Sequence, residues 1–464
     1  MEKGYSRETK MGEMPIPKLL VSMALPAIIS MFVQAMYNVV DSIFVAQVSE
    51  NALTAVSLAF PVQMVIVSCF VGMGVGINSG ISRRLGEGRH KDAEQVAEHG
   101  FLIAIILSVI LAVLGGLFSH GFVTLFTDNQ EIIAGCTSYL MICCVFCFGS
   151  IITQAGFSML QGSGDMIQPM IGQLIGAVVN IVLDPIMIFG LLGFPAMGVT
   201  GAAVATVAGQ IVAMIYVLCV VAFRKKNILK VHIHGFKFDG TIMKDIIAVG
   251  LPAAVMQGIA SFMVTFYNLI LTQYGTTAIA VFGVFFKVQS FIFMPVFGLC
   301  QGAMPIYGYN YGARKADRFL QNAKVACIIS ECIMILGVVL FQFFPEQIFR
   351  MFNASDDMMV LGVQCFRVIS WSFVTAGISI PLSNAFQAVG KAYISMFSSF
   401  LRQMILLLPF SWLFSYLWGV DWIWLGFVVS DVLNLIYVGV MFVRLKRKEL
   451  DTWGQHKGML SAQG

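Results

Sequence analysis

The chain has 464 residues, of which 58% are hydrophobic and only 11% are charged, whereas a soluble domain carries roughly a quarter charged residues. This composition excludes an ordinary soluble fold. The formal net charge of +4 does not require a nucleic-acid partner, because lysines and arginines beside membrane helices are attracted to anionic lipid head groups. We therefore expect membrane lipids around the chain and no nucleic acid.

Apolar runs recur along the whole chain, and many reach the roughly 20 residues that a helix needs to cross a bilayer. The polar, Gly and Pro residues between them predict twelve spans. The first six lie near residues 16–46, 53–80, 95–118, 131–158, 167–192 and 197–223, and the second six near 243–272, 277–306, 319–344, 358–385, 393–417 and 421–443. The expected fold is an all-α integral membrane protein of two pseudo-symmetric six-helix bundles.

Polar segments and positive charge predict the domains and the orientation. The expected parts are an N-terminal tail (1–15), an N-lobe (16–223), a linker (224–242), a C-lobe (243–443) and a C-terminal tail (444–464). Lysines and arginines gather in the tails, in the linker and in the turn after the second span, while the opposite loops hold only Arg350. The positive-inside rule then places both termini in the cytoplasm and makes the chain a multi-pass protein of the cell membrane.

The two halves repeat each other. A shift of 226 residues superimposes them without a gap over long stretches and places Leu25-Pro26 on Leu251-Pro252. Further matching pairs are Ala52/Ala278, Phe60/Phe286, Gln63/Gln289, Gly72/Gly298, Gly76/Gly302, Gly86/Gly312, Gln161/Gln387 and Gly164/Gly390. Since each half has an even number of spans, both run the same way through the bilayer. Such a pair suits alternating access, in which one bundle rocks against the other.

Acidic residues inside the N-terminal spans are the first candidates for function, since a charge at mid-bilayer costs roughly 2.5–3.5 kcal/mol on insertion scales. Asp41 shares a helix face with Tyr37 and Asn38, and Asp184 shares one with Asn180. Two carboxylates with amide and phenol oxygens in one bundle can hold a proton or coordinate sodium. The sequence therefore predicts an ion-coupling site here.

The repeat supports a functional role for this acidic set. Tyr139 is expected to enter the same region from the outer end of the fourth span. The positions equivalent to Asp41, Asn180 and Asp184 are Tyr267, Leu406 and Phe410. Only the N-terminal half keeps the acids, which indicates ion coupling in one lobe. The alternative is a buried hydrogen-bonded network with a structural role alone.

Charged residues also interrupt the C-terminal spans. Lys287 and Arg402 are placed to neutralise Glu331 and Asp431, because unpaired charges in hydrocarbon are costly. Structural and substrate-contacting roles stay open for them. Abundant Met and Phe, 28 and 39 residues, suit an adaptable cavity for flat organic cations. The expected cavity residues are Gln34, Met256, Gln289, Glu331, Arg402 and Asp431.

Catalytic and metal chemistry find little support in the sequence. The ten cysteines fall almost all in apolar runs, where thiols behave as small hydrophobes. Gly164-Asp165 resembles the motif of membrane aspartyl proteases, which need two facing carboxylates. Asp165 is expected to cap the fifth span at its cytoplasmic end, most of a bilayer away from Asp41. We expect no enzyme and no cofactor besides a coupling proton or sodium ion.

Several motifs resemble the MATE family, the multidrug and toxic compound extrusion transporters, over nearly the whole chain. They are Leu25-Pro26, Tyr37-Asn38-x-x-Asp41, Gln161-Gly162-x-Gly164-Asp165, Asn180-x-x-x-Asp184-Pro185, Gly198-x-x-Gly201-Ala202-Ala203-x-Ala205-Thr206 and Gln301-Gly302-x-x-Pro305-x-x-Gly308-Tyr309-Asn310-Tyr311-Gly312-Ala313. Together these motifs are specific.

The resemblance implies efflux of cationic, amphiphilic compounds in exchange for protons or sodium through a V-shaped pair of six-helix bundles. It places the coupling site, and any sodium ligands, at Asp41, Asn180 and Asp184, with Thr206 and Tyr139 as further members. The alternatives are a flippase or an exporter of another lipid or metabolite in the same superfamily. A major-facilitator exporter is disfavoured, because the basic turn after the second span lacks that family's aspartate. We expect the chain to work as a monomer.

Overall fold

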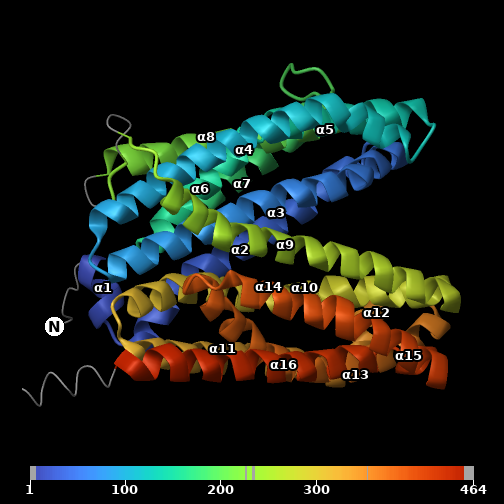
Figure 1. The fold of residues 1–464 in the computed structure, drawn as a ribbon. Helices are drawn as coiled ribbons and strands as arrows, with labels where there is room; N and C mark the ends of the chain where they lie inside the picture. Colours follow the sequence, from blue (N-terminus) through green and yellow to red (C-terminus); the bar gives the residue numbers. More distant parts are fainter. Residues whose placement is uncertain (1–6, 225–226, 232–235, 353, 454–464) are drawn as a thin grey trace, which may run out of the picture. The chain divides into compact units, whose positions relative to one another are not determined.

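The computed structural model describes residues 7–224, 227–231, 236–352 and 354–453. Lys225 and Lys226 of the predicted linker and the tail beyond residue 453 lie outside the described residues. The first half of the chain forms α1 (Arg7–Glu13), α2 (Ile16–Ala46), α3 (Glu50–Gly86), α4 (His90–Thr124), α5 (Gln130–Val145), α6 (Phe148–Gly162), α7 (Ile167–Phe189) and α8 (Val199–Phe223), which Figure 1 shows in blue to green.

The second half repeats this order of long helices. It forms α9 (Gly240–Leu271), α10 (Thr276–Gly312), α11 (Ala316–Phe343), α12 (Pro345–Met351), α13 (Asp356–Ala388), α14 (Ala392–Phe400), α15 (Leu408–Trp418) and α16 (Leu425–Leu445). Short 3₁₀ turns η1 (Thr272–Tyr274) and η3 (Val420–Trp422) and the π-helices η2 (Leu401–Leu407) and η4 (Lys446–Leu450) join or extend them.

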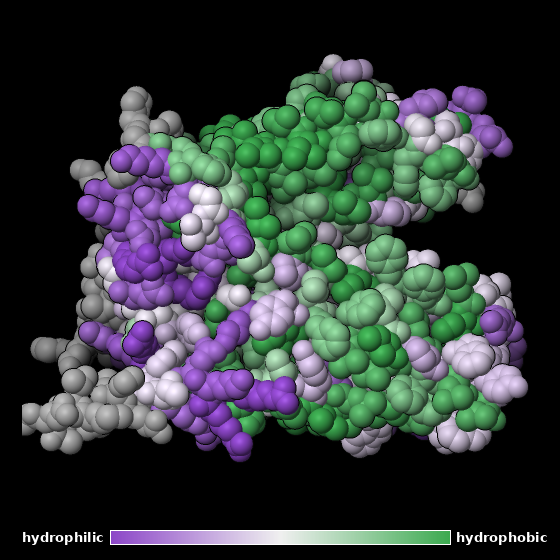
Figure 2. Space-filling view, in the orientation of Figure 1, coloured by the Kyte–Doolittle hydropathy of each residue, from purple (hydrophilic) through white to green (hydrophobic). Residues whose placement is uncertain are grey.

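The described helices confirm a multi-span membrane fold. Eleven of them are long and apolar enough to cross a bilayer, and α5 with α6 makes twelve if this pair, bent by 41°, is one span. The bend interrupts the predicted span 131–158. Apolar side chains cover the middle of the surface, and hydrophilic ones gather at its ends (Figure 2). On α4, for example, Val109 and Val113 are more than half exposed, as lipid-facing side chains are.

The helices pack into two compact units whose boundaries differ from those of the predicted lobes. Unit 1 comprises Met1–Ile28 and Val255–Gly464, and unit 2 comprises Ile29–Ala254. Each boundary follows a proline inside a helix, Pro26 in α2 or Pro252 in α9, by two residues. A proline removes an intrahelical hydrogen bond, so each helix can change its packing partner there. The predicted lobes 16–223 and 243–443 stay a prediction.

Glycines explain why the first part of α9 belongs to unit 2 and the first part of α2 to unit 1. A Cβ added at Gly76 of α3 would lie 2.4 Å from the carbonyl oxygen of Ile246 in α9. A Cβ added at Gly302 of α10 would lie 2.6 Å from the backbone nitrogen of Ala24 in α2. Such backbone approaches leave no room for a side chain. The repeated glycines therefore mark two equivalent close helix pairs.

Ionic contacts at the helix ends extend this packing. Asp245 of α9 lies 2.9 Å from Arg84 and 3.3 Å from Arg83 at the end of α3. Asp165 caps α7, as predicted, because its Oδ1 accepts from the backbone N–H of Ile167 at 3.3 Å. Its Oδ2 also accepts from Arg224, at 2.7 Å. These contacts account for charged residues that the site does not use.

Both ends of the described chain dock at the same end of unit 1. Arg318 of α11 donates to the carbonyl oxygens of Met11 and Met14, at 3.0 and 2.8 Å, and so holds α1. Glu449 of η4 accepts from Tyr311 and Lys391. The first and last described elements, α1 and η4, therefore lie at the same end of the helices of this unit, which agrees with an even number of spans.

Candidate ion-coupling site

Asp184, Asn180 and Thr206 meet where α7 and α8 pack closely in unit 2. The backbones approach because a Cβ at Gly209 of α8 would lie 2.6 Å from the carbonyl oxygen of Gly176 in α7. Asn180 lies one turn before Asp184, so the two side chains share a helix face. Asp184 is 0% exposed, Asn180 2% and Thr206 8%. The structure thus brings three predicted site residues together in a buried position.

The amide of Asn180 bridges its two neighbours in either of two orientations. In one, its Nδ2 donates to Asp184 Oδ1 and to Thr206 Oγ1, at 3.3 Å each. In the other, the amide nitrogen donates to Asp184 Oδ2 at 3.3 Å, and the amide oxygen accepts from the backbone N–H of Thr206 at 3.2 Å. Either way, Asn180 fixes the Asp184 carboxylate and leaves part of its acceptor capacity for an ion.

Asp41 of α2 completes the acidic pair. Its carboxylate interacts electrostatically with Asp184, Tyr37 and Tyr139. The Oδ1 atom of Asp41 is buried and has no hydrogen-bond partner among the residues that the structure describes. A buried acceptor without a donor is costly, and a bound proton or sodium ion would satisfy it. Carboxylate, amide and hydroxyl oxygens can accept a proton's hydrogen bond or act as ligand atoms for sodium.

Two further residues belong to this cluster, and the predicted set does not contain them. Gln63 of α3 donates from Nε2 to the hydroxyl of Tyr139 at 2.9 Å. Cys143 lies beside both side chains and interacts electrostatically with Asp41. Gln63 stood out in the sequence only as a repeated residue, and Cys143 only as one of several apolar thiols. The signal that could have identified Gln63 is its amide side chain within an apolar run.

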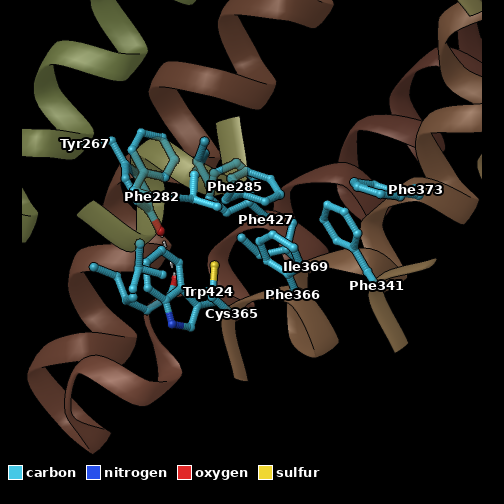
Figure 3. Close-up of a cluster of buried hydrophobic side chains, with 14 of the residues drawn as sticks. Tyr267, Phe282, Phe285, Phe341, Cys365, Phe366, Ile369, Phe373, Trp424 and Phe427 are labelled. Carbon is cyan, nitrogen blue, oxygen red and sulfur yellow. Dashed lines mark hydrogen bonds between the residues drawn. The ribbon is translucent and has the colours of Figure 1, made fainter. Parts of the chain in front are cut away.

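The equivalent region of the second half is an aromatic core, and the described residues that form this buried cluster include no acid (Figure 3). Tyr267 and Cys365, which match Asp41 and Tyr139, are both 0% exposed there. The ring of Tyr267 lies 4.7 Å from that of Phe282 and 5.2 Å from that of Phe427. The asymmetry seen in the sequence is therefore also an asymmetry of packing.

Of the two charge pairs expected in the C-terminal spans, the structure contains the pair of Arg402 and Asp431. Arg402 Nη1 lies 3.1 Å from Asp431 Oδ1, and the Asp431 side chain is 6% exposed. The predicted neutralisation of Glu331 by Lys287 is wrong for the structure described. Glu331 Oε2 is buried against Gly377 and lacks a hydrogen-bond partner within the described part of the chain, while Lys287 is exposed. Residue 377 is a glycine, so the Glu331 side chain can pack flat against α13 instead of reaching for a cation.

The remaining candidates are more scattered. Gln34 and Asn38 are exposed on α2. Met256 lies near Gln387, whose Nε2 is 3.8 Å from the methionine sulfur, and Gln289 is half-buried. Gln34 belongs to unit 2 and the other predicted cavity residues to unit 1. Their role as a substrate cavity stays a prediction.

Eleven or twelve apolar spans among the described helices, with two acids inside one bundle, are typical of a membrane transporter and not of an enzyme. The model of the MatE family matches residues 26–186 and 252–413. The two matched segments begin at Pro26 and Pro252, the positions that the internal repeat superimposes. The chain belongs to the MatE family of transporters, and it is a multi-pass protein of the cell membrane.

Named relatives extend over almost the whole chain. The chain is 26% identical over 425 residues to an FAD transporter of Shewanella oneidensis, which covers 90% of this chain and 92% of the relative. It is 27% identical over 435 residues to the probable multidrug resistance protein NorM of Thermotoga maritima, and the alignment covers 93% of this chain and 92% of the relative. The solved structure of a MOP superfamily transporter from Pyrococcus furiosus matches with a TM-score of 0.88 and 25% sequence identity. The match covers 96% of this chain and 100% of that structure's chain.

Proposed function

We propose that this chain is a secondary active efflux transporter that exchanges cationic, amphiphilic compounds for protons or sodium by alternating access. The observation that carries the proposal is the pair of Asp41 and the buried Asp184, in which the buried Oδ1 of Asp41 has no hydrogen-bond partner among the described residues. Relatives named as multidrug transporters support the class of substrate. Asn180, Thr206, Tyr139, Tyr37 and Asn38 are the proposed companions of the pair.

The proposed coupling is thermodynamic. An ion shifts a conformational equilibrium only by its difference in affinity for the two states. Binding of a proton or sodium ion to Asp41 and Asp184 removes net negative charge from an apolar bundle, and the helices can then repack more tightly around the site. The state that holds the ion therefore differs in energy from the state that holds the organic cation, and the ion gradient drives the exchange.

Exchange requires that ion and substrate weaken each other's binding, and this linkage is reciprocal. The affinity of the purified protein for a fluorescent organic cation such as ethidium should therefore fall as protons or sodium ions are added. Titration of ethidium fluorescence over a range of pH and of sodium concentration measures this linkage. An affinity that depends on neither ion would contradict exchange.

Export of an anionic metabolite is the second candidate, and a specific observation favours it. Arg402 places a partly exposed guanidinium group among the helices of unit 1, and one relative is an FAD transporter. An arginine can hold a phosphate by two hydrogen bonds. Saturable quenching of flavin fluorescence by the protein, competed by ethidium, would favour this candidate. Lack of flavin binding would leave cation efflux.

We further propose that both termini are cytoplasmic and that the protein works as a monomer in contact with membrane lipids. Arg318 and Lys391 lie at the end of unit 1 where α1 and η4 dock, in agreement with the positive-inside rule. A cysteine probe in the loop between α8 and α9 should be labelled only from the cytoplasm, and one at Asp128 only from outside. Reversed labelling would overturn the orientation, and a dimer by light scattering would overturn the monomer.

A further inference from the structure

Three consecutive cations, Lys446, Arg447 and Lys448, lie where the last spanning helix leaves the hydrocarbon. Helix α16 begins at Leu425, and a helix needs roughly 20 residues to cross a bilayer, which brings the chain to Arg444. The helical run does not stop there, because it continues into η4. The three cations therefore follow the spanning part directly and lie at the level of the lipid head groups.

The π-helical backbone of η4 turns all three cations outward. The backbone N–H of Asp451 donates to the carbonyl oxygen of Lys446, five residues earlier. Residues five apart point to different sides of an α-helix, but a π-helix stacks them on one side. Leu445 and Leu450 are five apart, and they are accordingly only 5% and 1% exposed. The three cations between these leucines are exposed, so the turn presents an unbroken row of positive charge.

No acid neutralises this row within the part of the chain that the structure describes. The adjacent Glu449 is already paired with Lys391. The turn between α3 and α4 differs, because there Arg89 pairs with Glu87 at 3.0 Å and with Asp92. The cations of η4 are thus left for an anion from outside the chain.

Contacts on the other side of η4 hold the row in place. Glu449 accepts from Tyr311 at the end of α10 and from Lys391, the residue before α14. The ring of Trp453 lies 5.2 Å from that of Tyr311. Cations that are fixed before a ligand arrives lose less conformational entropy on binding than cations on a free tail.

We propose that Lys446, Arg447 and Lys448 form a binding surface for the head groups of anionic phospholipids. The row is complementary in charge to a phosphate ester, and each lysine or arginine beside an anionic membrane surface adds to the attraction. The acyl chains of a lipid hold its phosphate at this depth, which a dissolved anion cannot match. The orientation proposed above places the surface in the cytoplasmic leaflet, but binding itself depends neither on that orientation nor on transport.

The test measures lipid binding to the purified protein by native mass spectrometry. Phosphatidylglycerol and phosphatidylcholine with the same acyl chains are titrated in detergent, so that only the head group differs. The wild type should bind phosphatidylglycerol roughly tenfold more tightly or better. The triple variant Lys446→Gln/Arg447→Gln/Lys448→Gln should bind phosphatidylglycerol roughly 10- to 100-fold more weakly and phosphatidylcholine as before.

The matched control is Arg89→Gln/Lys91→Gln/Lys244→Gln. It removes the same net charge from exposed side chains of unit 2 and should leave the affinity for phosphatidylglycerol unchanged. Equal binding of the two lipids by the wild type, or an equal loss in the control, would overturn the proposal. Displacement of the bound lipid by inorganic phosphate would overturn it too, since the ligand would then be a dissolved anion.

Two milder variants answer the question if the triple variant does not fold. Lys446→Arg/Lys448→Arg keeps the charge and should bind phosphatidylglycerol as tightly as the wild type. Arg447→Gln alone should bind it roughly fivefold more weakly. A loss in the first variant, or none in the second, contradicts a charged head-group surface. Because transport is not the readout, failure here leaves the proposed coupling site untouched, and failure of that site leaves this surface untouched.

Discussion

Replacement of Arg402 by methionine should lower the apparent free energy of unfolding in detergent by roughly 3–5 kcal/mol, the loss that follows when one partner of a buried ion pair is removed. Arg402 is the only cation that lies within 4 Å of Asp431 among the described residues. The Asp431 side chain is 6% exposed, so water cannot replace the guanidinium. Chemical unfolding followed by intrinsic tryptophan fluorescence measures the change.

The double variant Arg402→Met/Asp431→Leu is the informative control. It removes both charges, so it should regain most of the lost stability. Asp431→Asn alone should cost less than Arg402→Met, because the Arg402 side chain is 29% exposed and can reach water. If Arg402→Met is as stable as the wild type, the pair does not stabilise the fold and a role in substrate contact gains weight.

The π-helix η2 shows why this pair was only partly predictable. The sequence indicated that Arg402 and Asp431 were partners, because charges in hydrocarbon need them. It gave no sign that the backbone widens over Leu401–Leu407, since a π-helix has no residue signature as strong as a proline. The equivalent positions in the first half are Gly176 and Ala205, where α7 and α8 approach closely without charges.

The spans followed from apolar length and the repeat from matching residues, but the packing partners did not. Gly76 and Gly302 were visible as a repeated pair. That Gly76 contacts α9 and Gly302 contacts α2 depends on a change of partner after Pro252 and Pro26, and one-dimensional patterns do not report such exchanges. Glu331 shows the same limit. Its charge predicted a neighbouring cation, but in the structure its carboxylate lies against Gly377 of α13.

Neutralisation of either acid of the proposed coupling site should have the largest effect on transport. Asp41→Asn and Asp184→Asn keep the size of the side chain but cannot change charge when an ion arrives. The ion then loses its difference in affinity for the two conformations, and its gradient no longer drives export. Both variants should stay folded, because an amide retains hydrogen-bonding capacity at each position.

The exposed Asp128, in the loop between α4 and α5, offers a control of the same chemistry. Asp128→Asn removes a carboxylate outside the bundle and should leave transport unchanged. Substrate binding at zero ion gradient should be at least partly retained in Asp41→Asn and Asp184→Asn. This result would separate a loss of coupling from a loss of the fold.

The most direct measurement is accumulation of ethidium by proteoliposomes under an imposed proton or sodium gradient, with the wild type, Asp41→Asn and Asp184→Asn side by side. Wild-type protein should accumulate ethidium against its concentration gradient, with an ion flux in the opposite direction, and both variants should fall to the level of protein-free liposomes. Transport at the wild-type rate by both variants would contradict coupling through Asp41 and Asp184 and would direct attention to Glu331 and Asp431.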